Sequence, residues 1–441
     1  MTGDELIESY KKTHPHSGDL HERAISVFSG EGASSFVRVL DPYRPYITHA
    51  KGSKKWDVDG NEYIDYVMGH GALLLGHSHP TIIEAVQKQI VKGVHYGDNH
   101  ELEVEWAELI KRMVPSAERV ELFSCGQEAN LMAIRLSRIF TGRKKILRFI
   151  ENFHGWADEV ALPPESPGIT SREVKTIPYD LKQVEQELAA GEYAILMTEG
   201  GGAHMSGQVP LDFEFVKQLP ELTNRYGTVW HMDEVVTGFR DAVGGFQALA
   251  DVKPDLTSLG KIVGGGLGAG ALVGRADIMQ AFSRQIPREK QVFHSGTWNG
   301  NPLTSAAGIA TLSFIQDGKP QEKANQLASE LRKQGNKMLR DKGINGWLYG
   351  RSITHIYLGP IEFEPADEIS PPTEDINKIV GVDMTRLRLD LHLLKRGVAT
   401  MLARMFIMSS EHTEEDVEKT VSILAESIDA MIKEGSMKRP Q

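Results

Sequence analysis

The sequence VWHMDEVVTGFRDAVGGFQALADVKPDLTSLGKIVGGGLGAGALVG occupies residues 229–274 and contains two short apolar runs that each lead to a reactive side chain. The first run, residues 229–232, leads to Asp233, and the second, residues 256–259, leads to Lys261. Both runs are too short for a helix and are bounded by glycine or proline, so each predicts a buried strand.

A lysine and a carboxylate at two strand ends suit pyridoxal phosphate. That cofactor forms a Schiff base with a lysine amine, and an acidic partner keeps its pyridinium nitrogen protonated so that the ring accepts electrons. Each residue also has an ordinary interpretation, because Lys261 stands in a glycine-rich loop and Asp233 could favour a helix N-terminus. A dinucleotide loop at residues 264–270 is a weaker alternative, because no G-x-G-x-x-G stands between a strand and a helix there.

The composition restricts the partners of this chain. Its 441 residues predict about two or three domains, and its net charge of −11 argues against nucleic acid or an anionic membrane as a partner. No apolar run approaches the roughly 18 residues of a membrane span, and the polar N-terminus MTGDELIESYKKTH carries no secretory signal. The single cysteine, Cys125, excludes an internal disulfide and suits a reducing cytoplasm.

The middle of the chain alternates strand patterns with helix patterns. Such alternation predicts an α/β domain with a mostly parallel sheet, whose ligands bind at the carboxyl ends of the strands. We expect strands at residues 119–123, 145–149, 194–198, 229–232, 256–259 and 271–273, and helices at 81–94, 101–113, 129–140 and 213–226. The residues predicted at strand ends are Cys125, Phe153, Glu199, Asp233 and Lys261.

The turn Ser-Cys-Gly-Gln-Glu at residues 124–128 joins a strand to a long helix. Free N–H groups at such a helix start form an anion site, although an ordinary helix cap is the simpler interpretation. Cys125 has no identifiable base beside it, so a nucleophilic role is not favoured. The histidines at 70, 77 and 79 have no clustered cysteine or carboxylate, so we interpret them as structural or wall residues and predict no metal site.

The two ends of the chain predict a smaller α+β domain. Residues 34–69 alternate apolar and polar positions around turn signals, which indicates an antiparallel meander. The tail from 345 to 407 mixes short strands with a helix, and a last helix at 413–433 opens with a Thr413-x-x-Asp416 capping box. We therefore predict an N-terminal part of the small domain at 1–70, a large domain at 71–325 and a C-terminal part of the small domain at 326–441.

Several motifs along nearly the whole chain belong together: WDVDGNEYIDY, GHSHP, SCGQEA, FHG, DEVVTGFR, TSLGKIVGGGLGAGALVG and GTWNGNP. On these motifs the chain resembles the class III, fold-type I aminotransferases, which use pyridoxal phosphate. Within that family it is similar to the branch of glutamate-1-semialdehyde aminomutase, D-phenylglycine aminotransferase and β-phenylalanine aminotransferases. The resemblance implies a large domain with a mostly parallel, seven-stranded-type sheet, and a homodimer with a shared active site.

The resemblance also assigns roles. Lys261 would carry the cofactor and move the proton, Asp233 would pair with the pyridinium nitrogen, and Val235 would pack under the ring. Phe153 would stack on the ring where the family usually has tyrosine, and Thr297 would reach phosphate held by the neighbouring subunit. The remaining cofactor-binding residues would be Cys125, Gly126, Gln127, His154 and Glu199. The turn departs from the usual NSGTEA, so a threonine contact to phosphate is replaced by Gln127, and Gly200 replaces the usual proline after Glu199.

The resemblance leaves the reaction open. We favour transamination, in which an amino donor of the D-α- or β-amino acid type and a keto acid acceptor react in turn. The alternative is a glutamate-1-semialdehyde-type 2,1-aminomutase, and a racemase of the same fold is less favoured. Transamination is favoured because Arg404 stands where the aminomutase has a glutamate, and a guanidinium suits a substrate carboxylate. Arg38 is the first candidate for that carboxylate, with a surface salt bridge as the alternative, and His70 would line the side-chain pocket.

Overall fold

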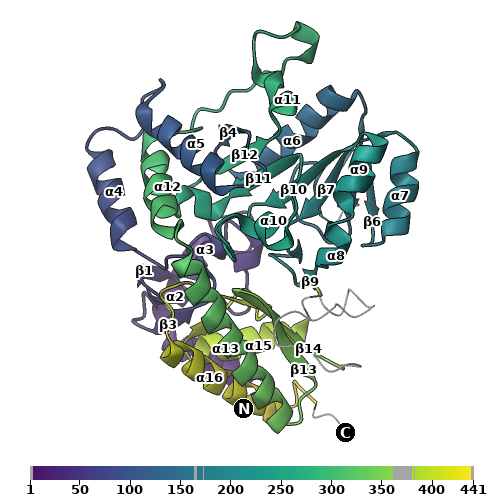
Figure 1. Cartoon of the computed structure of the whole chain (residues 1–441). Coiled ribbons are helices and arrows are strands. Elements are labelled where there is room, and N and C mark those ends of the chain that lie inside the picture. Colours follow the sequence, from purple (N-terminus) through teal and green to yellow (C-terminus); the bar gives the residue numbers. More distant parts are fainter. Residues whose placement is uncertain (1–2, 163–165, 172, 361–379, 382, 439–441) are drawn as a thin grey trace. The chain divides into compact units, whose positions relative to one another are not determined.

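The computed structural model describes residues 3–162, 166–171, 173–360, 380–381 and 383–438. The chain forms two compact units (Figure 1). We call Gly71–Leu73 with Pro80–Glu322 the large unit, and Met1–His70, Leu74–His79 and Lys323–Gln441 the terminal unit.

The large unit is built on a seven-stranded sheet whose central strands lie side by side in Figure 1. The strand order is β4 (Arg119–Phe123), β12 (Gly270–Gly274), β11 (Leu256–Gly260), β10 (Val229–Glu234), β7 (Tyr193–Glu199), β5 (Lys145–Phe149) and β6 (Val174–Ile177). All neighbouring pairs are parallel except those of β12, which runs antiparallel to β4 and β11. The predicted α/β fold with a mostly parallel sheet is confirmed.

Both faces of this sheet are buried, as strands of a parallel sheet require. Side chains alternate between faces, so Ile195 and Met197 of β7 pack in one core while Leu196 packs in the other. The first core includes α6 (Gly126–Thr141), and the second includes α7 (Leu181–Ala189), α9 (Leu219–Tyr226) and α10 (Gly245–Ala250). The remaining helices of four residues or more within this unit are α4 (Pro80–Ile90), α5 (Glu101–Met113), α8 (Phe213–Val216), α11 (Ala276–Met279) and α12 (Pro302–Ile315).

One predicted helix is wrong in detail. The pattern at residues 213–226 predicts a single helix, but the structure has α8 and then α9. Pro220 lies in the first turn of α9, where a missing N–H costs nothing, whereas it could not stand inside a continuous helix.

The terminal unit contains two small sheets. The predicted meander is present as β1 (Ile47–Lys51), β2 (Lys54–Asp57) and β3 (Glu62–Asp65), and β15 (Val398–Ala399) pairs with β3 in parallel. The two ends of the chain therefore share one sheet. The second sheet holds β13 (Gly346–Gly350), β14 (Ile353–Leu358) and β16 (Met405–Ile407). Among the described residues, the α-helices that lie wholly in this unit are α1 (Gly3–Thr13), α2 (Pro15–Ile25), α15 (Met384–Lys395) and α16 (Glu414–Glu434).

Helix α13 (Lys319–Asp341) carries the chain from the large unit into the terminal unit. The capping box of α16 is confirmed, since Thr413 Oγ1 accepts the N–H of Asp416 and the Asp416 carboxylate accepts the N–H of Thr413, both at 3.1 Å. Within the described ranges, no helix combines the length and apolar character that crossing a bilayer requires.

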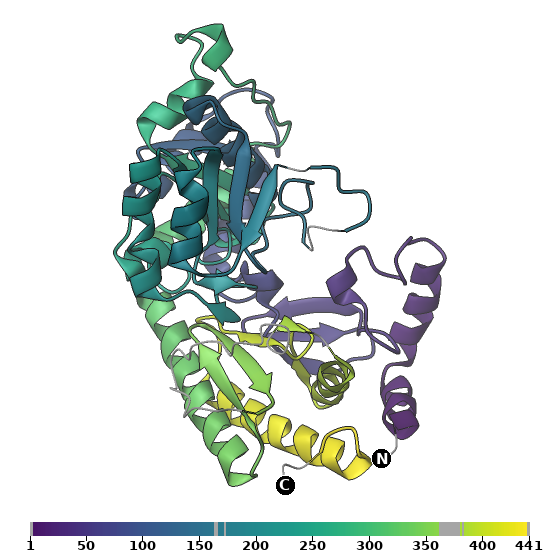
Figure 2. The same ribbon diagram turned by 90° about the vertical axis from the view of Figure 1, so that its right-hand side faces the viewer.

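Helices α15 and α16, olive and yellow in Figure 2, are joined by a buried ion pair. The Glu434 side chain is 1% exposed and accepts Arg388 Nε at 2.7 Å and Nη2 at 2.8 Å. Burial opposes ionisation, yet the bonds from Arg388, Ser436 and His392 lower the pKa of Glu434 to about 2. A lowered pKa stabilises the fold above the ordinary value near 4.5, and this stabilisation is lost as the pH falls through about 2.

We expect Glu434→Gln to destabilise the protein by about 2–3 kcal/mol at pH 7, because Arg388 then lacks its charged partner. The difference in Tm between variant and wild type should shrink as the pH is lowered from 7 to 3. Glu426→Gln on the same helix is the control, because the Glu426 side chain is 63% exposed and lies 3.7 Å from Arg396. A pH-independent difference for Glu434→Gln would contradict the assignment.

Candidate active site

The functional residues predicted in the large unit gather at one edge of its sheet. Strands β4, β5, β7, β10 and β11 all run in the same direction, since β12 is antiparallel to both β4 and β11. Their carboxyl ends therefore meet at one edge, where ligands of α/β proteins bind. The residues brought there are Cys125, Phe153, Glu199, Asp233 and Lys261.

Lys261 begins a short 3₁₀ helix directly after β11 and has a left-handed φ of 52°. Such a backbone costs a non-glycine residue free energy and is concentrated at functional sites. Its Nζ has no hydrogen bond or ion pair with any residue that the structure describes. Burial and the charge of Arg240 lower the pKa of Lys261, while Asp233 and Glu199 oppose the shift. Lys261 is half-buried, and an amine of lowered pKa is suited to nucleophilic and base chemistry.

Asp233 is 5% exposed, and three groups hold its carboxylate: an imidazole, a side-chain amide and a backbone N–H. His154 Nδ1 lies 2.8 Å from its Oδ2, Asn130 Nδ2 donates to the same oxygen at 2.7 Å, and the N–H of Val235 donates to Oδ1 at 2.9 Å. Burial would raise the pKa of Asp233, but the bonds from His154 and Val235 hold it below its usual value. The carboxylate is therefore an ionised acceptor held in one orientation.

Asn130 and His231 were missed in the sequence. His231 is fully buried two residues before Asp233, on the same face of β10, with Nε2 at 2.8 Å from Ser258 Oγ, and burial lowers its pKa to about 3. Each of these residues is a polar position inside an apolar pattern, Asn130 in a helix and His231 in a strand. Such a position indicates a buried polar side chain that needs a hydrogen-bond partner.

The Val235 side chain packs closely against the backbone of two glycines, Gly126 and Gly260. A Cβ on Gly126 would come 2.3 Å from Val235 Cγ2, and a Cβ on Gly260 would come 2.9 Å from Val235 Cγ1. Both distances are far below van der Waals contact, so only glycine fits at either position. Val235 thus packs between the start of α6 and the end of the strand that leads to Lys261.

The predicted anion turn is present at the start of α6. Cys125 is the N-cap residue and its exposed side chain makes no capping bond, so the first N–H groups, including Gly126 and Gln127, remain for a ligand. The Gln127 side chain faces the next loop instead, where its Oε1 accepts the N–H of Trp156 at 2.6 Å. A Cβ on Gly155 would come 2.5 Å from Gln127 Cγ, so that glycine makes room for the contact.

Phe153 is 39% exposed and meets Trp156 edge-on, with ring centroids 5.0 Å apart. Its N–H donates to the Glu199 carboxylate at 3.1 Å. Burial, together with Asp233, raises the pKa of Glu199 to about 8, although backbone N–H donors pull it lower. Gly200 replaces the expected proline for a visible reason, because its N–H donates to the carbonyl of Asp233 at 2.8 Å and proline has no N–H.

Thr297 lies on an exposed loop of the large unit. Its carbonyl accepts a hydrogen bond from His95 Nε2, and the neighbouring Trp298 is 58% exposed and meets the His95 ring edge-on. Its predicted contact with a second subunit stays a prediction.

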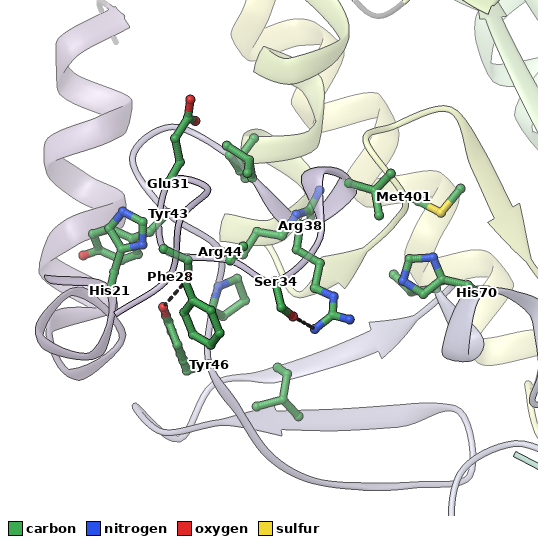
Figure 3. Close-up of a pocket in the computed structure, with 18 of the residues that line it drawn as sticks. His21, Phe28, Glu31, Ser34, Arg38, Tyr43, Arg44, Tyr46, His70 and Met401 are labelled. Atoms are coloured by element: carbon green, nitrogen blue, oxygen red, sulfur yellow. Dashed lines mark hydrogen bonds between the residues drawn. The ribbon is translucent and has the colours of Figure 1, made fainter. Parts of the chain in front are cut away.

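Arg38 and His70 line one cavity of about 420 Å³ within the terminal unit. In Figure 3, His70 and Met401 lie toward one end of this cavity, His21 and Phe28 lie toward the other, and Arg38 stands between them. Arg38 Nη1 donates to Ser34 Oγ at 3.5 Å, and Arg38 has no carboxylate partner among the described residues. Arg404 is not among the described residues of that lining, and its charge lies near the phenol of Tyr349.

The residues of the large unit fit pyridoxal phosphate. A half-buried lysine without a partner among the described residues, an ionised buried carboxylate and an uncapped helix start correspond to the aldehyde, ring nitrogen and phosphate of that cofactor. His154 Nε2 is buried without a hydrogen-bond partner in the described structure, so this atom could still form a hydrogen bond with a ligand at this edge.

The chain matches the family model described as Aminotransferase class-III over residues 38–345. It is 34% identical to a glutamate-1-semialdehyde 2,1-aminomutase of Methanopyrus kandleri, covering 96% of this chain and 99% of the relative. A β-phenylalanine aminotransferase from Variovorax paradoxus superimposes with a TM-score of 0.86 at 26% identity, covering 98% of each chain.

A structure described as a transaminase with PLP bound superimposes with a TM-score of 0.83 at 25% identity, over 96% of this chain and 99% of the other. The lysine, carboxylate and helix start described above are the groups that such a cofactor requires. The chain belongs to the class-III aminotransferase family of pyridoxal phosphate-dependent enzymes.

Proposed function

We propose that this enzyme moves an amino group within one substrate, in the manner of a glutamate-1-semialdehyde 2,1-aminomutase. The observation that carries the proposal is the 34% identity to such an aminomutase over 96% of the chain. The comparisons thus favour the aminomutase over the transamination that the sequence argument preferred. The substrate would be an amino aldehyde that also bears a carboxylate.

Pyridoxal phosphate, when bound, supplies an aldehyde that captures amines and a ring that accepts an electron pair. Lys261 would attach to it through Nζ and, once released, take up and return a proton at the carbon bearing the amino group. The lowered pKa of Lys261 supports this role, because a neutral amine can accept a proton. Asp233 would hold a proton on the ring nitrogen, and His154 and Asn130 would keep its carboxylate in place.

Other residues would bind and orient. The N–H groups of Gly126 and Gln127 would hold the phosphate at the start of α6, next to Cys125. Val235 would pack under the ring and Phe153 would stack on it. Glu199 would position Phe153 through its backbone N–H, and His154 would position Asp233. These are proposals for binding and positioning.

Transamination between an amino acid and a keto acid is the second candidate. One position favours it, since Arg404 stands where the aminomutases carry a glutamate. The 26% identity to a β-phenylalanine aminotransferase also supports transamination. A cation in place of an anion would suit the carboxylate of an amino acid.

One experiment separates the two candidates. The enzyme in its amino form is given glutamate-1-semialdehyde without any added keto acid. An aminomutase would turn over many equivalents, because its substrate supplies both the amino and the carbonyl group. The aldehyde form would then be tested with a panel of D-α- and β-amino acids. A transaminase would stop after about one product per subunit and continue only when 2-oxoglutarate or pyruvate is added. Absence of turnover in both arms would contradict both candidates.

Arg38 is proposed to hold the substrate carboxylate. Arg38 has no carboxylate partner among the described residues, which supports this role, and a guanidinium binds a carboxylate through two parallel bonds. We expect Arg38→Ala to lower kcat/KM by about 30- to 150-fold for a carboxylate-bearing substrate, and far less for its decarboxylated analogue. Arg404→Ala is measured in parallel. Equal losses on both substrates would contradict recognition of the carboxylate.

We also propose that the enzyme acts as a homodimer in which Thr297 contacts cofactor phosphate held by the partner. The exposure of the 296–298 loop supports this arrangement, because its polar and aromatic side chains are available to another chain. Sedimentation is expected to show a dimer at catalytic concentrations, and Thr297→Val should weaken cofactor binding. A fully active monomer would contradict the proposal.

A further inference from the structure

Glu199 binds two loops that are far apart in the sequence. We call residues 151–156 the Phe153 loop and residues 200–208 the Met205 loop. The carboxylate is 4% exposed; Oε2 accepts the N–H of Phe153 at 3.1 Å and of His204 at 3.2 Å, and Oε1 accepts the N–H of Met205 at 2.9 Å. One buried side chain thus satisfies N–H groups of both loops, and buried N–H groups left without an acceptor are costly.

The Met205 loop has an unusual backbone around this carboxylate. His204, Met205 and Ser206 have left-handed φ values of 55°, 57° and 67° in succession. Three non-glycine residues in that region carry strain that persists only when surrounding contacts impose it. The Glu199 carboxylate supplies such contacts at the first two of these residues.

A second bond ties the same two loops, since His204 Nε2 lies 2.7 Å from Glu151 Oε2. Asn152 Oδ1 accepts the N–H of Glu199 at 2.9 Å, which fastens the Phe153 loop to the end of β7. Glu151 is itself left-handed, with φ of 60°. The two loops are therefore held as one body at the carboxyl edge of the sheet.

The Met205 loop carries one side chain toward the lysine. A Cβ built on Gly71 would lie 3.7 Å from Lys261 Cδ and 3.8 Å from Met205 Cε, so the two side chains approach the same point. Phe153, proposed to stack on the cofactor, stands on the other loop. Its backbone N–H is one of those bound to the carboxylate.

We propose that Glu199 is a positioning residue, which fastens the Phe153 and Met205 loops together and so sets where Phe153 and Met205 lie relative to Lys261. The consequence for catalysis rests on the proposed function, whereas the fastening itself does not. Met205 would then influence which substrates fit, because its apolar side chain lies near the aliphatic part of the Lys261 side chain.

Hydrogen exchange measured by mass spectrometry on the cofactor-free protein tests the fastening. Glu199→Leu has a similar size and removes both acceptor oxygens. We expect peptides covering both loops to exchange at least about tenfold faster in this variant. Glu234→Leu is the matched control, because Glu234 is also a buried carboxylate that accepts backbone N–H groups, from Phe246 and Gln247. It should loosen the start of α10 and leave both loops unchanged.

Unchanged exchange in Glu199→Leu, or faster exchange in one loop alone, would overturn the proposal. If Glu199→Leu does not fold, Glu151→Ala removes the outer tie to His204 and should speed exchange of the Met205 loop. No change in that variant would again overturn the proposal. The loaded enzyme gives the second readout. Positioning predicts an altered visible circular dichroism of bound pyridoxal phosphate and a KM raised about tenfold, with a smaller fall in kcat. Loosened loops with an unchanged dichroism and KM would reduce Glu199 to a purely structural role.

Discussion

Replacing Lys261 with alanine is expected to abolish covalent attachment of pyridoxal phosphate and to slow turnover by about 10⁴-fold or more. Alanine removes both the amine that carries the cofactor and the base that moves the proton. Lys261 is suited to both tasks because it is half-buried, has a lowered pKa and has no hydrogen-bond or ion-pair partner among the described residues. Its left-handed backbone indicates that the fold imposes this position.

Borohydride reduction of the loaded enzyme followed by peptide mapping checks the attachment, and the label should be found on Lys261 alone. Lys253→Ala is the control, since the Lys253 side chain is 55% exposed and lies near Glu118 on the surface. It should leave both label and turnover unchanged. A label on another lysine, or turnover of Lys261→Ala within about tenfold of wild type, would reject the assignment.

Asp233→Asn is expected to leave the protein folded and to slow the chemical step at least about 100-fold, or ~2.7 kcal/mol of barrier. The amide cannot hold the proton on the ring nitrogen, so the ring becomes a poorer electron acceptor. The lowered pKa of Asp233 keeps the wild-type carboxylate ionised at pH 7. The asparagine also presents an amide where His154 now meets a carboxylate oxygen.

Single-turnover rates measured with saturating cofactor test this effect separately from binding. Asp255→Asn is the matched control, because Asp255 contacts the same pair of strands at their opposite end, accepting the N–H of Trp230 at 2.8 Å. That change should lower Tm without slowing the folded enzyme. A rate for Asp233→Asn within about threefold of wild type, less than 1 kcal/mol, would reject the proposed pairing.

The gathering of residues at the sheet edge could be predicted because it depends on local patterns. Short apolar runs mark the strands, and the carboxyl ends of strands running in one direction meet at one edge. Asp233 and Lys261 were therefore placed together without any knowledge of the folded chain. The sequence also carries a signal for the antiparallel direction of β12. Only residues 261–269 separate β12 from β11, whereas the connection between two parallel strands needs a dozen or more residues.

The orientation of side chains could not be predicted in the same way. Whether Gln127 faces an anion or the N–H of Trp156 depends on a loop that approaches from elsewhere in the chain. Likewise, Asn130 and Asp233 are 103 positions apart, and only the packing of α6 on the sheet brings them within 2.7 Å.

By itself, the sequence determined the α/β class and the strand ends at which Asp233 and Lys261 lie, because periodicity and turn residues act over a few neighbouring positions. Only the tertiary structure decided which groups hold those two residues. The His154 bond to Asp233, the left-handed Lys261 and the attachment of two distant loops to Glu199 all arise from long-range packing. Hydrogen bonds require atoms to meet within about 3 Å, and that precision comes from the packing of the whole sheet and its helices.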